Sequence, residues 1–145
     1  MIVKFDYDCR IMINPNEVEK GNYIRIIGKP EIFQVQGKQA GLLPKPGVVF
    51  LLKDQQGWIT PEETEGITLT PAALHNLGLL EVDVATSGGK LFAFRVKDGP
   101  DFIIYQRSEG ANVWTYKPTR RDVGLVHELQ NLFFSITGKQ LEVNL

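Results

Sequence analysis

The feature that most constrains the fold is an apolar stripe between Asp122 and Gly138. Apolar residues recur there at the three- and four-residue spacing of an amphipathic helix. They are Leu125, Val126, Leu129, Leu132, Phe133 and Ile136. Asp122 is the predicted N-cap, and Gly138 is the predicted C-terminal stop. A helix with one apolar face of this kind must pack against another layer of the fold.

That layer is predicted between residues 80 and 116, where the hydrophobic period changes to two. The alternating runs at 80–85, 91–97, 102–107 and 113–116 are separated by short turns. This pattern predicts a four-strand antiparallel meander. One face of the meander carries aromatic and aliphatic residues, and the C-terminal helix is its natural cover. A last alternating segment, 141–145, predicts a final strand that is added to a sheet.

The first part of the chain, up to residue 52, has shorter β-rich runs that are separated by Gly- and Pro-containing segments. Two β-rich runs, 22–27 and 31–36, flank the turn residues 28–30 and predict a hairpin. A Gly-led strand, a turn and a second strand are typical of a small bent barrel of the SH3-like kind. Glycines and prolines between residues 37 and 48 predict a loop, and the apolar run 48–52 predicts a buried strand.

A short helix is predicted between these two parts of the chain. Thr70 is placed as its N-cap, Pro71 as its first residue and Gly78 as its stop. The predicted fold class is therefore α+β and mostly antiparallel β, with a small N-terminal SH3-like barrel-type part, a short helix, a four-strand meander and a C-terminal helix packed on the sheet. We expect 1–66 and 67–145 to form one compact unit or two small subdomains.

Composition excludes several classes of function. Sixteen basic and seventeen acidic residues leave a net charge of -1, which argues against a general electrostatic attraction to nucleic acid or to anionic membranes. The single cysteine, Cys9, excludes an intramolecular disulfide and a four-cysteine zinc site. No apolar run approaches the roughly 18 residues of a membrane span, and the acidic N-terminus is unlike a signal peptide. We expect a cytoplasmic protein that has no membrane contact.

The motifs that suggest catalysis fail on spacing. His127-Glu128 resembles the start of the zinc-protease helix motif, but position 131, where the second histidine belongs, is Asn. The pair is expected to face solvent. Nothing in the sequence brings Cys9 to a histidine, as a thiol dyad would require. The run 87–90 lies between predicted strands, so it is expected to be a hairpin turn and not a phosphate-binding loop. We predict no catalytic residue, cofactor or metal.

Two sets of residues are candidates for binding surfaces. The first is the polar side of the C-terminal helix with one apolar outlier, and it would serve a protein partner or self-association: His127, Glu128, Gln130, Asn131 and Phe134. The second mixes aromatic and basic residues, a combination that stacks bases and holds phosphates: Tyr105, Arg107, Trp114, Tyr116, Lys117, Arg120 and Arg121. Core packing of the aromatic residues, with Lys and Arg on the solvent face, accounts better for the second pattern, and we favour that interpretation.

Two stretches of the sequence carry a family resemblance. Residues 126–141 read VHELQNLFFSITGKQL, which resembles the C-terminal signature VHxLQNLYxxLTGxEL of a family of short uncharacterised proteins from Bacteroidetes genomes, often from prophages or mobile elements. Residues 66–79 are similar to the family's I-x-L-T segment, which precedes a helix ending at Gly. Residues 17–24 loosely match its opening, so 1–11 are expected to be an extension. The resemblance implies a bacterial, intracellular accessory protein with no assigned activity.

The expected function is therefore non-enzymatic binding or assembly through protein–protein contacts. The alternative is a nucleic-acid-binding accessory protein that uses an aromatic-basic sheet face. The third is an enzyme of unknown class, which would need a cleft with a perturbed acid–base pair.

Overall fold

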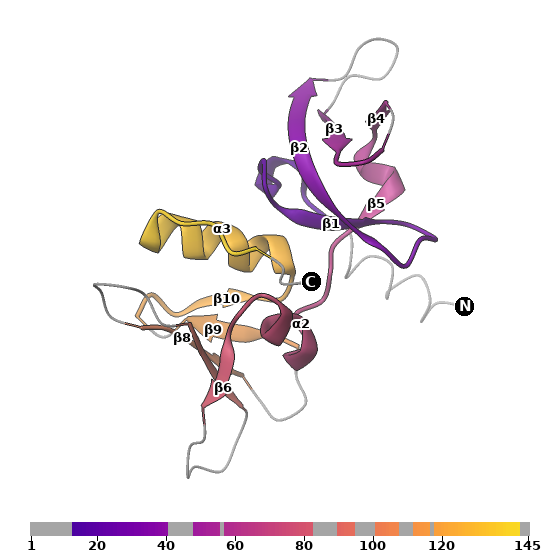
Figure 1. The fold of residues 1–145 in the computed structure, drawn as a ribbon. Helices are drawn as coiled ribbons and strands as arrows, with labels where there is room; N and C mark the ends of the chain where they lie inside the picture. Colours follow the sequence, from indigo (N-terminus) through magenta and orange to yellow (C-terminus); the bar gives the residue numbers. More distant parts are fainter. Residues whose placement is uncertain are drawn as a thin grey trace. The chain divides into compact units, whose positions relative to one another are not determined.

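A computed structural model describes residues 13–40, 48–55, 57–82, 90–94, 101–107, 112–116 and 118–142. The chain divides into two compact units: the first comprises residues 1–67 and 125–128, and the second comprises residues 68–124 and 129–145. The described strands form two five-stranded sheets with antiparallel neighbours, and the described helical elements are two short 3-10 helices and two α-helices (Figure 1). The fold is α+β and mostly antiparallel β, as the alternating runs predict.

The first unit contains a sheet with the strand order β4-β3-β2-β1-β5. Its elements are η1 (Pro15–Glu17), β1 (Tyr23–Ile26), β2 (Ile32–Ala40), β3 (Val48–Leu52), β4 (Trp58–Ile59), η2 (Pro61–Glu63) and β5 (Thr64–Glu65). The expected hairpin is confirmed, since β1 and β2 are antiparallel and pair Ile24 with Phe33. Gly28 lies in the hairpin connection with φ of 88°, a backbone conformation that favours glycine.

The expected closure of this part into an SH3-like barrel is not supported. Among the described strands, β4 and β5 lie at opposite ends of the strand order, so the sheet remains open. Both edge strands have two residues each, and strands of that length offer few backbone groups for a closing ladder.

The loop expected at residues 37–48 is partly wrong. Strand β2 continues to Ala40 and pairs along β3, with a shift of register between Val35 and Gly37. Gly37 therefore marks a β-bulge and does not end the strand. The remaining part of that predicted loop, 41–47, lies outside the described residues.

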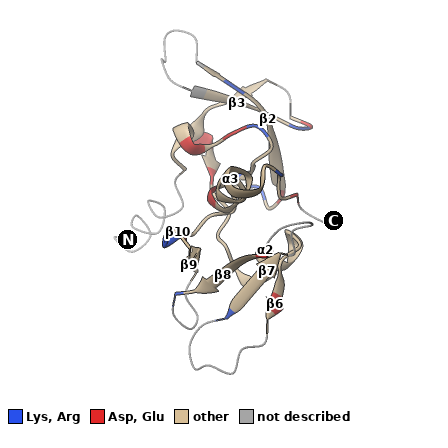
Figure 2. Ribbon diagram, turned by 90° about the vertical axis from the view of Figure 1, so that its left-hand side faces the viewer, with Lys and Arg blue, Asp and Glu red and all other residues tan. Residues whose placement is uncertain are grey.

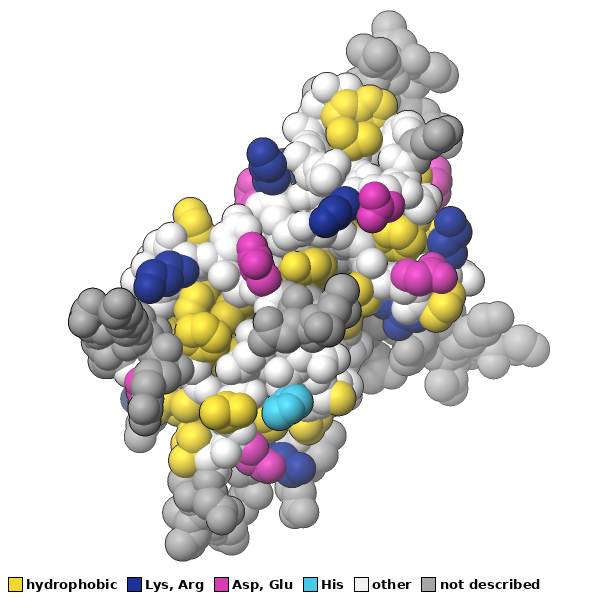
Figure 3. Space-filling view, in the orientation of Figure 1, with side chains coloured by type: hydrophobic (Ala, Val, Ile, Leu, Met, Phe, Trp, Pro, Cys, Tyr) yellow, Lys and Arg dark blue, Asp and Glu magenta, His cyan; other side chains and the backbone are white. Residues whose placement is uncertain are grey.

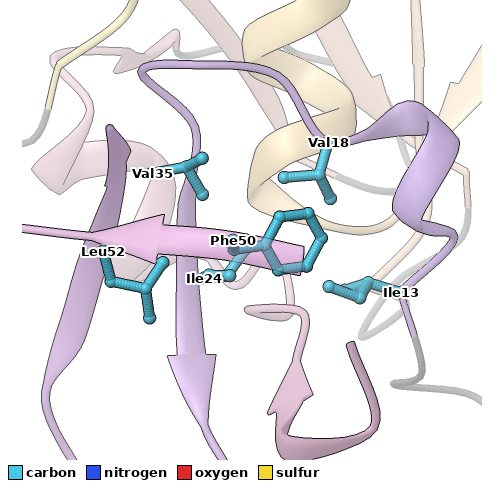
Figure 4. Packing of buried hydrophobic residues seen from close by; sticks show 6 residues of the cluster. All are labelled: Ile13, Val18, Ile24, Val35, Phe50 and Leu52. Carbon is cyan, nitrogen blue, oxygen red and sulfur yellow. The ribbon is translucent and has the colours of Figure 1, made fainter. Parts of the chain in front are cut away.

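The core of the first unit is aliphatic around one aromatic ring. Phe50 and Leu52 come from β3, which confirms the buried strand predicted there, and they are fully buried. Figure 4 shows the cluster that these two side chains share with residues from η1's flanks and from β1 and β2. Its members are Ile13, Val18, Ile24, Val35, Phe50 and Leu52.

The second unit contains a meander with the strand order β10-β9-β8-β7-β6. Its elements are α2 (Pro71–Asn76), β6 (Leu80–Val82), β7 (Leu91–Phe94), β8 (Phe102–Gln106), β9 (Trp114–Tyr116), β10 (Arg121–Val123) and most of α3 (Val126–Thr137). The short helix is confirmed with its cap, because the Thr70 hydroxyl accepts a hydrogen bond from the Ala73 N–H at 3.1 Å. The meander has one more strand than expected, β10.

Helix α3 covers the inner face of this sheet, as predicted. The Phe133 ring meets Phe94 and Phe102 edge-on, with centroid distances of 5.0 and 5.1 Å. Deeper in the same layer, Trp114 is fully buried and its indole Nε1–H donates to the Leu69 carbonyl at 2.7 Å. These contacts tie the strands, the helix and the segment before α2 into one core.

The predicted start of α3 is wrong. Asp122 is not a helix cap; it lies in β10, where its carboxylate accepts a hydrogen bond from the Thr115 hydroxyl at 2.6 Å and pairs with Arg107. The helix begins at Val126, and the Glu128 carboxylate accepts the Leu125 backbone N–H at 3.0 Å. This is half of a capping box, with the carboxylate three residues after the cap position.

The predicted final strand does not begin at Leu141. Leu141 and Glu142 lie outside any strand, and 143–145 are outside the described residues. Leu141 is nevertheless buried, and its carbonyl accepts a hydrogen bond from the Gln130 amide at 2.9 Å. The segment after α3 is thus held by the helix itself.

The neighbours Phe133 and Phe134 give a matched test of this packing. Phe133 is 1% exposed and Phe134 is 51% exposed. We expect Phe133→Ala to reduce the free energy of unfolding by about 3–5 kcal/mol, because it leaves a cavity beside the rings of Phe94 and Phe102. Phe134→Ala should change it by less than about 0.5 kcal/mol. Urea denaturation followed by Trp114 fluorescence in a Trp58→Phe background measures both; equal losses would contradict the packing of α3.

Candidate interaction surface

The first predicted surface, on α3, is split by the structure. His127 is 1% exposed and Gln130 is also buried, so neither faces solvent as expected. Glu128 is half-buried and is used in capping the helix, and Asn131 is half-buried too. Phe134 is the member of the set that stays exposed. The polar residues in this set are therefore largely buried, and they do not form the continuous surface that the sequence suggested.

The burial of His127 has an electrostatic consequence. Among the described residues, its Nδ1 atom has no hydrogen-bond partner. Burial lowers the pKa of His127 below its ordinary value of 6.5, and the neighbouring Glu128 carboxylate opposes that shift only in part. The folded chain thus favours the neutral imidazole.

The second predicted surface, the aromatic-basic set, is also dispersed. Trp114 is buried in the core, and Tyr116 stacks on Phe102 at a centroid distance of 4.8 Å. Tyr105 is exposed and lies on the opposite face of the sheet, since burial alternates along β8. The rings that would stack bases therefore do not share one accessible face.

The basic members of that set are not gathered either. Arg107 pairs with Asp122. Arg120, with φ of 55°, and Arg121 are exposed at the turn and strand that follow β9, and Lys117 lies outside the described residues. Basic and acidic positions are interspersed along the ribbons and on the face seen in space-filling view (Figures 2 and 3).

The structure instead presents an apolar surface that sequence reasoning missed. The register pairs Leu80 with Ala93 and Val82 with Leu91, and it pairs Leu91 with Tyr105 and Ala93 with Ile103. Residues that pair directly across strands share a face of the sheet. These side chains lie on the face opposite Phe92 and Phe102, and we call them the outer apolar face: Leu80, Val82, Leu91, Ala93, Ile103 and Tyr105.

The outer apolar face is accessible. Leu80 is 63% exposed, Val82 and Ile103 are 39% exposed, and Tyr105 is 36% exposed. Leu91 and Ala93 are half-buried between them. The sequence does contain the signal, which is the alternation of Leu80 and Val82 with Glu81. That alternation reads naturally as an inward-facing pair, and only the pairing with β7 shows that it faces outward.

The described residues offer no other site of recognisable chemistry. They contain no group of three or more His, Cys, Asp or Glu side chains that could hold a metal ion. In the same part of the chain, none of the helices combines the length and the apolarity needed to cross a membrane. Cys9, for which no histidine partner is predicted, lies outside the described residues.

Comparison with known proteins adds no family to this description: no family model, no curated protein and no solved structure matches the chain. The resemblance of residues 126–141 to the Bacteroidetes family stays a prediction.

The buried imidazole predicts a pH dependence of stability. In the unfolded chain a histidine titrates near 6.5, whereas in the folded chain burial of His127 disfavours its protonation. The contribution of the neutral imidazole to stability is therefore fully present well above pH 6.5, and it should be lost as the pH falls through 6.5 toward the lower pKa of the folded state, with a slope of at most about 1.4 kcal/mol per pH unit for one proton. Urea denaturation at several pH values measures this slope.

The variant His127→Leu tests the origin of this slope. It should flatten the slope below pH 6.5, whatever it does to stability itself, because it removes the buried imidazole. A slope that survives in His127→Leu would show that another group causes it.

Proposed function

We propose that this chain is a non-enzymatic binding or assembly protein that acts through protein–protein contacts, and that the outer apolar face of the second unit is its contact surface. The observation that carries the proposal is the exposure of Leu80, Val82, Ile103 and Tyr105 on one sheet face. Contiguous apolar side chains on a sheet face are costly to leave in water, and such patches mark interaction sites in soluble proteins.

The kind of residue supports a protein partner. Tyrosine is enriched at the centre of protein interfaces, where its ring is buried and its hydroxyl stays hydrogen-bonded. Leu80, Val82 and Ile103 provide aliphatic surface on either side of it. None of the six side chains of the face is charged, so the face has no group that would hold a phosphate or a carboxylate. A partner must therefore present apolar surface of its own.

At the β9 and β10 side, the rim of the face is polar and its groups already have partners. There the Asp122 carboxylate accepts from the Thr115 hydroxyl and pairs with Arg107. This arrangement is that of an interface patch, in which an apolar centre is bordered by polar groups that need no new partner. A partner can cover the centre without burying an uncompensated charge at this rim.

A photo-cross-linking experiment in cells that naturally make the protein tests this proposal. The cross-linking residue p-benzoylphenylalanine is placed at Tyr105 in one variant and at Phe134 in another, because both are exposed aromatic positions of the second unit. We expect protein adducts from position 105, and we expect Ile103→Lys in the same chain to abolish them, since the added charge would have to be desolvated in the contact.

Three outcomes would contradict the proposal. These are a lack of protein adducts at position 105, adducts with nucleic acid instead, or adducts that persist unchanged with Ile103→Lys. Adducts from position 134 alone would move the contact to α3, as the sequence first suggested.

A further inference from the structure

Helix α3 belongs to both units of the chain. The first unit includes Leu125–Glu128 and the second includes Leu129–Leu145, whereas α3 runs without a break over Val126–Thr137. From its contacts within each unit we infer that α3 is a coupling element: neither unit is complete without its share of the helix, so the two units unfold as one. This inference concerns the conformation of the chain and holds whatever partner binds the outer apolar face.

The first unit holds the start of α3 by packing and by a backbone hydrogen bond. The buried Gly66 leaves room for the Leu125 side chain, since a Cβ atom at position 66 would lie 2.8 Å from Leu125 Cδ1 and 3.2 Å from Ile13 Cγ2. The Val126 N–H donates to the Ile67 carbonyl at 2.8 Å. An N–H in the first turn of a helix has no acceptor inside the helix, so this bond satisfies it.

The second unit holds the remainder of α3 through its core. Leu129 and Phe133 are buried, and the Phe133 ring meets Phe94 and Phe102 edge-on. These contacts cover the inner face of the meander. If residues 129–137 lost their helical structure, that face would lose its cover.

Backbone hydrogen bonds of the helix join the two shares. In an α-helix, the carbonyl of residue i accepts the N–H of residue i+4. The carbonyls of Val126 and His127, in the first unit, therefore depend on the N–H groups of Gln130 and Asn131, in the second. Val126 and His127 are buried, and a buried carbonyl that loses its partner costs free energy. Melting of the second share would therefore undo the docking of the first.

Opening of the first unit acts on the second through the same helix. The Glu128 carboxylate accepts the Leu125 N–H at 3.0 Å, and both residues of this cap belong to the first unit. Without them, the second unit keeps a helix that has lost its first turn and its cap, and short helices are marginal without such support. Because the units share one folding equilibrium, a ligand that binds the folded form of either unit stabilises both.

Amide hydrogen exchange of the full chain, followed by NMR, measures this coupling. Two amides serve as reporters: the Val35 N–H donates to the Asn22 carbonyl in the first unit, and the Gln106 N–H donates to the Lys90 carbonyl in the second. Phe133→Ala should accelerate exchange at both by at least about a hundredfold, because its cavity destabilises the shared folded state. Exchange at Val35 that stays as in the wild type would overturn the coupling.

A milder variant keeps this experiment decisive. Phe133→Leu leaves a smaller cavity than Phe133→Ala, so it gives the same comparison if the alanine variant holds too little folded chain. The expected result is again an equal acceleration at Val35 and Gln106.

Gly66→Ala tests the coupling from the first unit. Its Cβ atom must displace Leu125, so we expect exchange at Val35 and at Gln106 to accelerate by the same factor. Acceleration at Val35 alone would show that the units unfold independently. No acceleration at either amide would show that the seat of Leu125 on Gly66 does not hold the helix, and it would overturn the inference as well.

Gly37→Ala is the matched control in the same unit. There the new Cβ atom would lie 3.9 Å from Leu51 Cβ, which is an ordinary van der Waals contact. This variant should leave exchange at Gln106 unchanged. Units that open independently would leave the proposed contact surface on the second unit unaffected, so failure of this inference is distinguishable from failure of the proposed function.

Discussion

The second unit depends on the contact between α3 and the inner face of its sheet. Phe133 meets two rings from neighbouring strands, and the layer below contains the buried Trp114, which is anchored to the Leu69 carbonyl. Burial of aromatic surface is the largest favourable term available to a unit of this size. Because the register of β7 on β8 places Phe92, Phe94, Phe102 and Ile104 toward the helix, it also forces their neighbours outward. The exposed outer face is thus a consequence of the same register that builds the core.

Elements with local signals could be predicted from the sequence. The Thr70–Pro71 start of α2, the β1–β2 hairpin and the apolar stripe of α3 each depend on residues that are close together in the chain. The predictions were wrong where residues distant in the chain determine the local structure. From local sequence, Asp122 is predicted to be a helix cap, but its carboxylate contacts Thr115 and Arg107 on neighbouring strands. Likewise, Gly37 is predicted to lie in a loop, but it pairs with β3 as part of strand β2. Two-residue edge strands leave too little sequence pattern to predict whether a sheet closes.

The candidate site was less predictable than the fold, for two physical reasons. The interior side of α3 is wider than its apolar stripe, so His127 and Gln130 are buried although their residue types suggest solvent. Polar type predicts exposure only on average, since a buried amide is stable once it has a partner such as the Leu141 carbonyl. For β6, a shift of one residue in register reverses both faces of a strand, and no local pattern fixes that shift. Leu80 and Val82 therefore came to lie outside.

The position of α3 along the chain has a consequence for synthesis. It is the last of the described elements, and residues 125–128 belong to the first unit while residues 129–137 belong to the second. A ribosome adds about 5–20 residues per second, so β6 to β10 are complete before their covering helix exists. During that interval the nascent sheet has both apolar faces open, including Phe94 and Phe102. A chain that ended before Val126 would therefore lack the helix that covers Phe94 and Phe102, and both faces of its sheet would stay open to other chains.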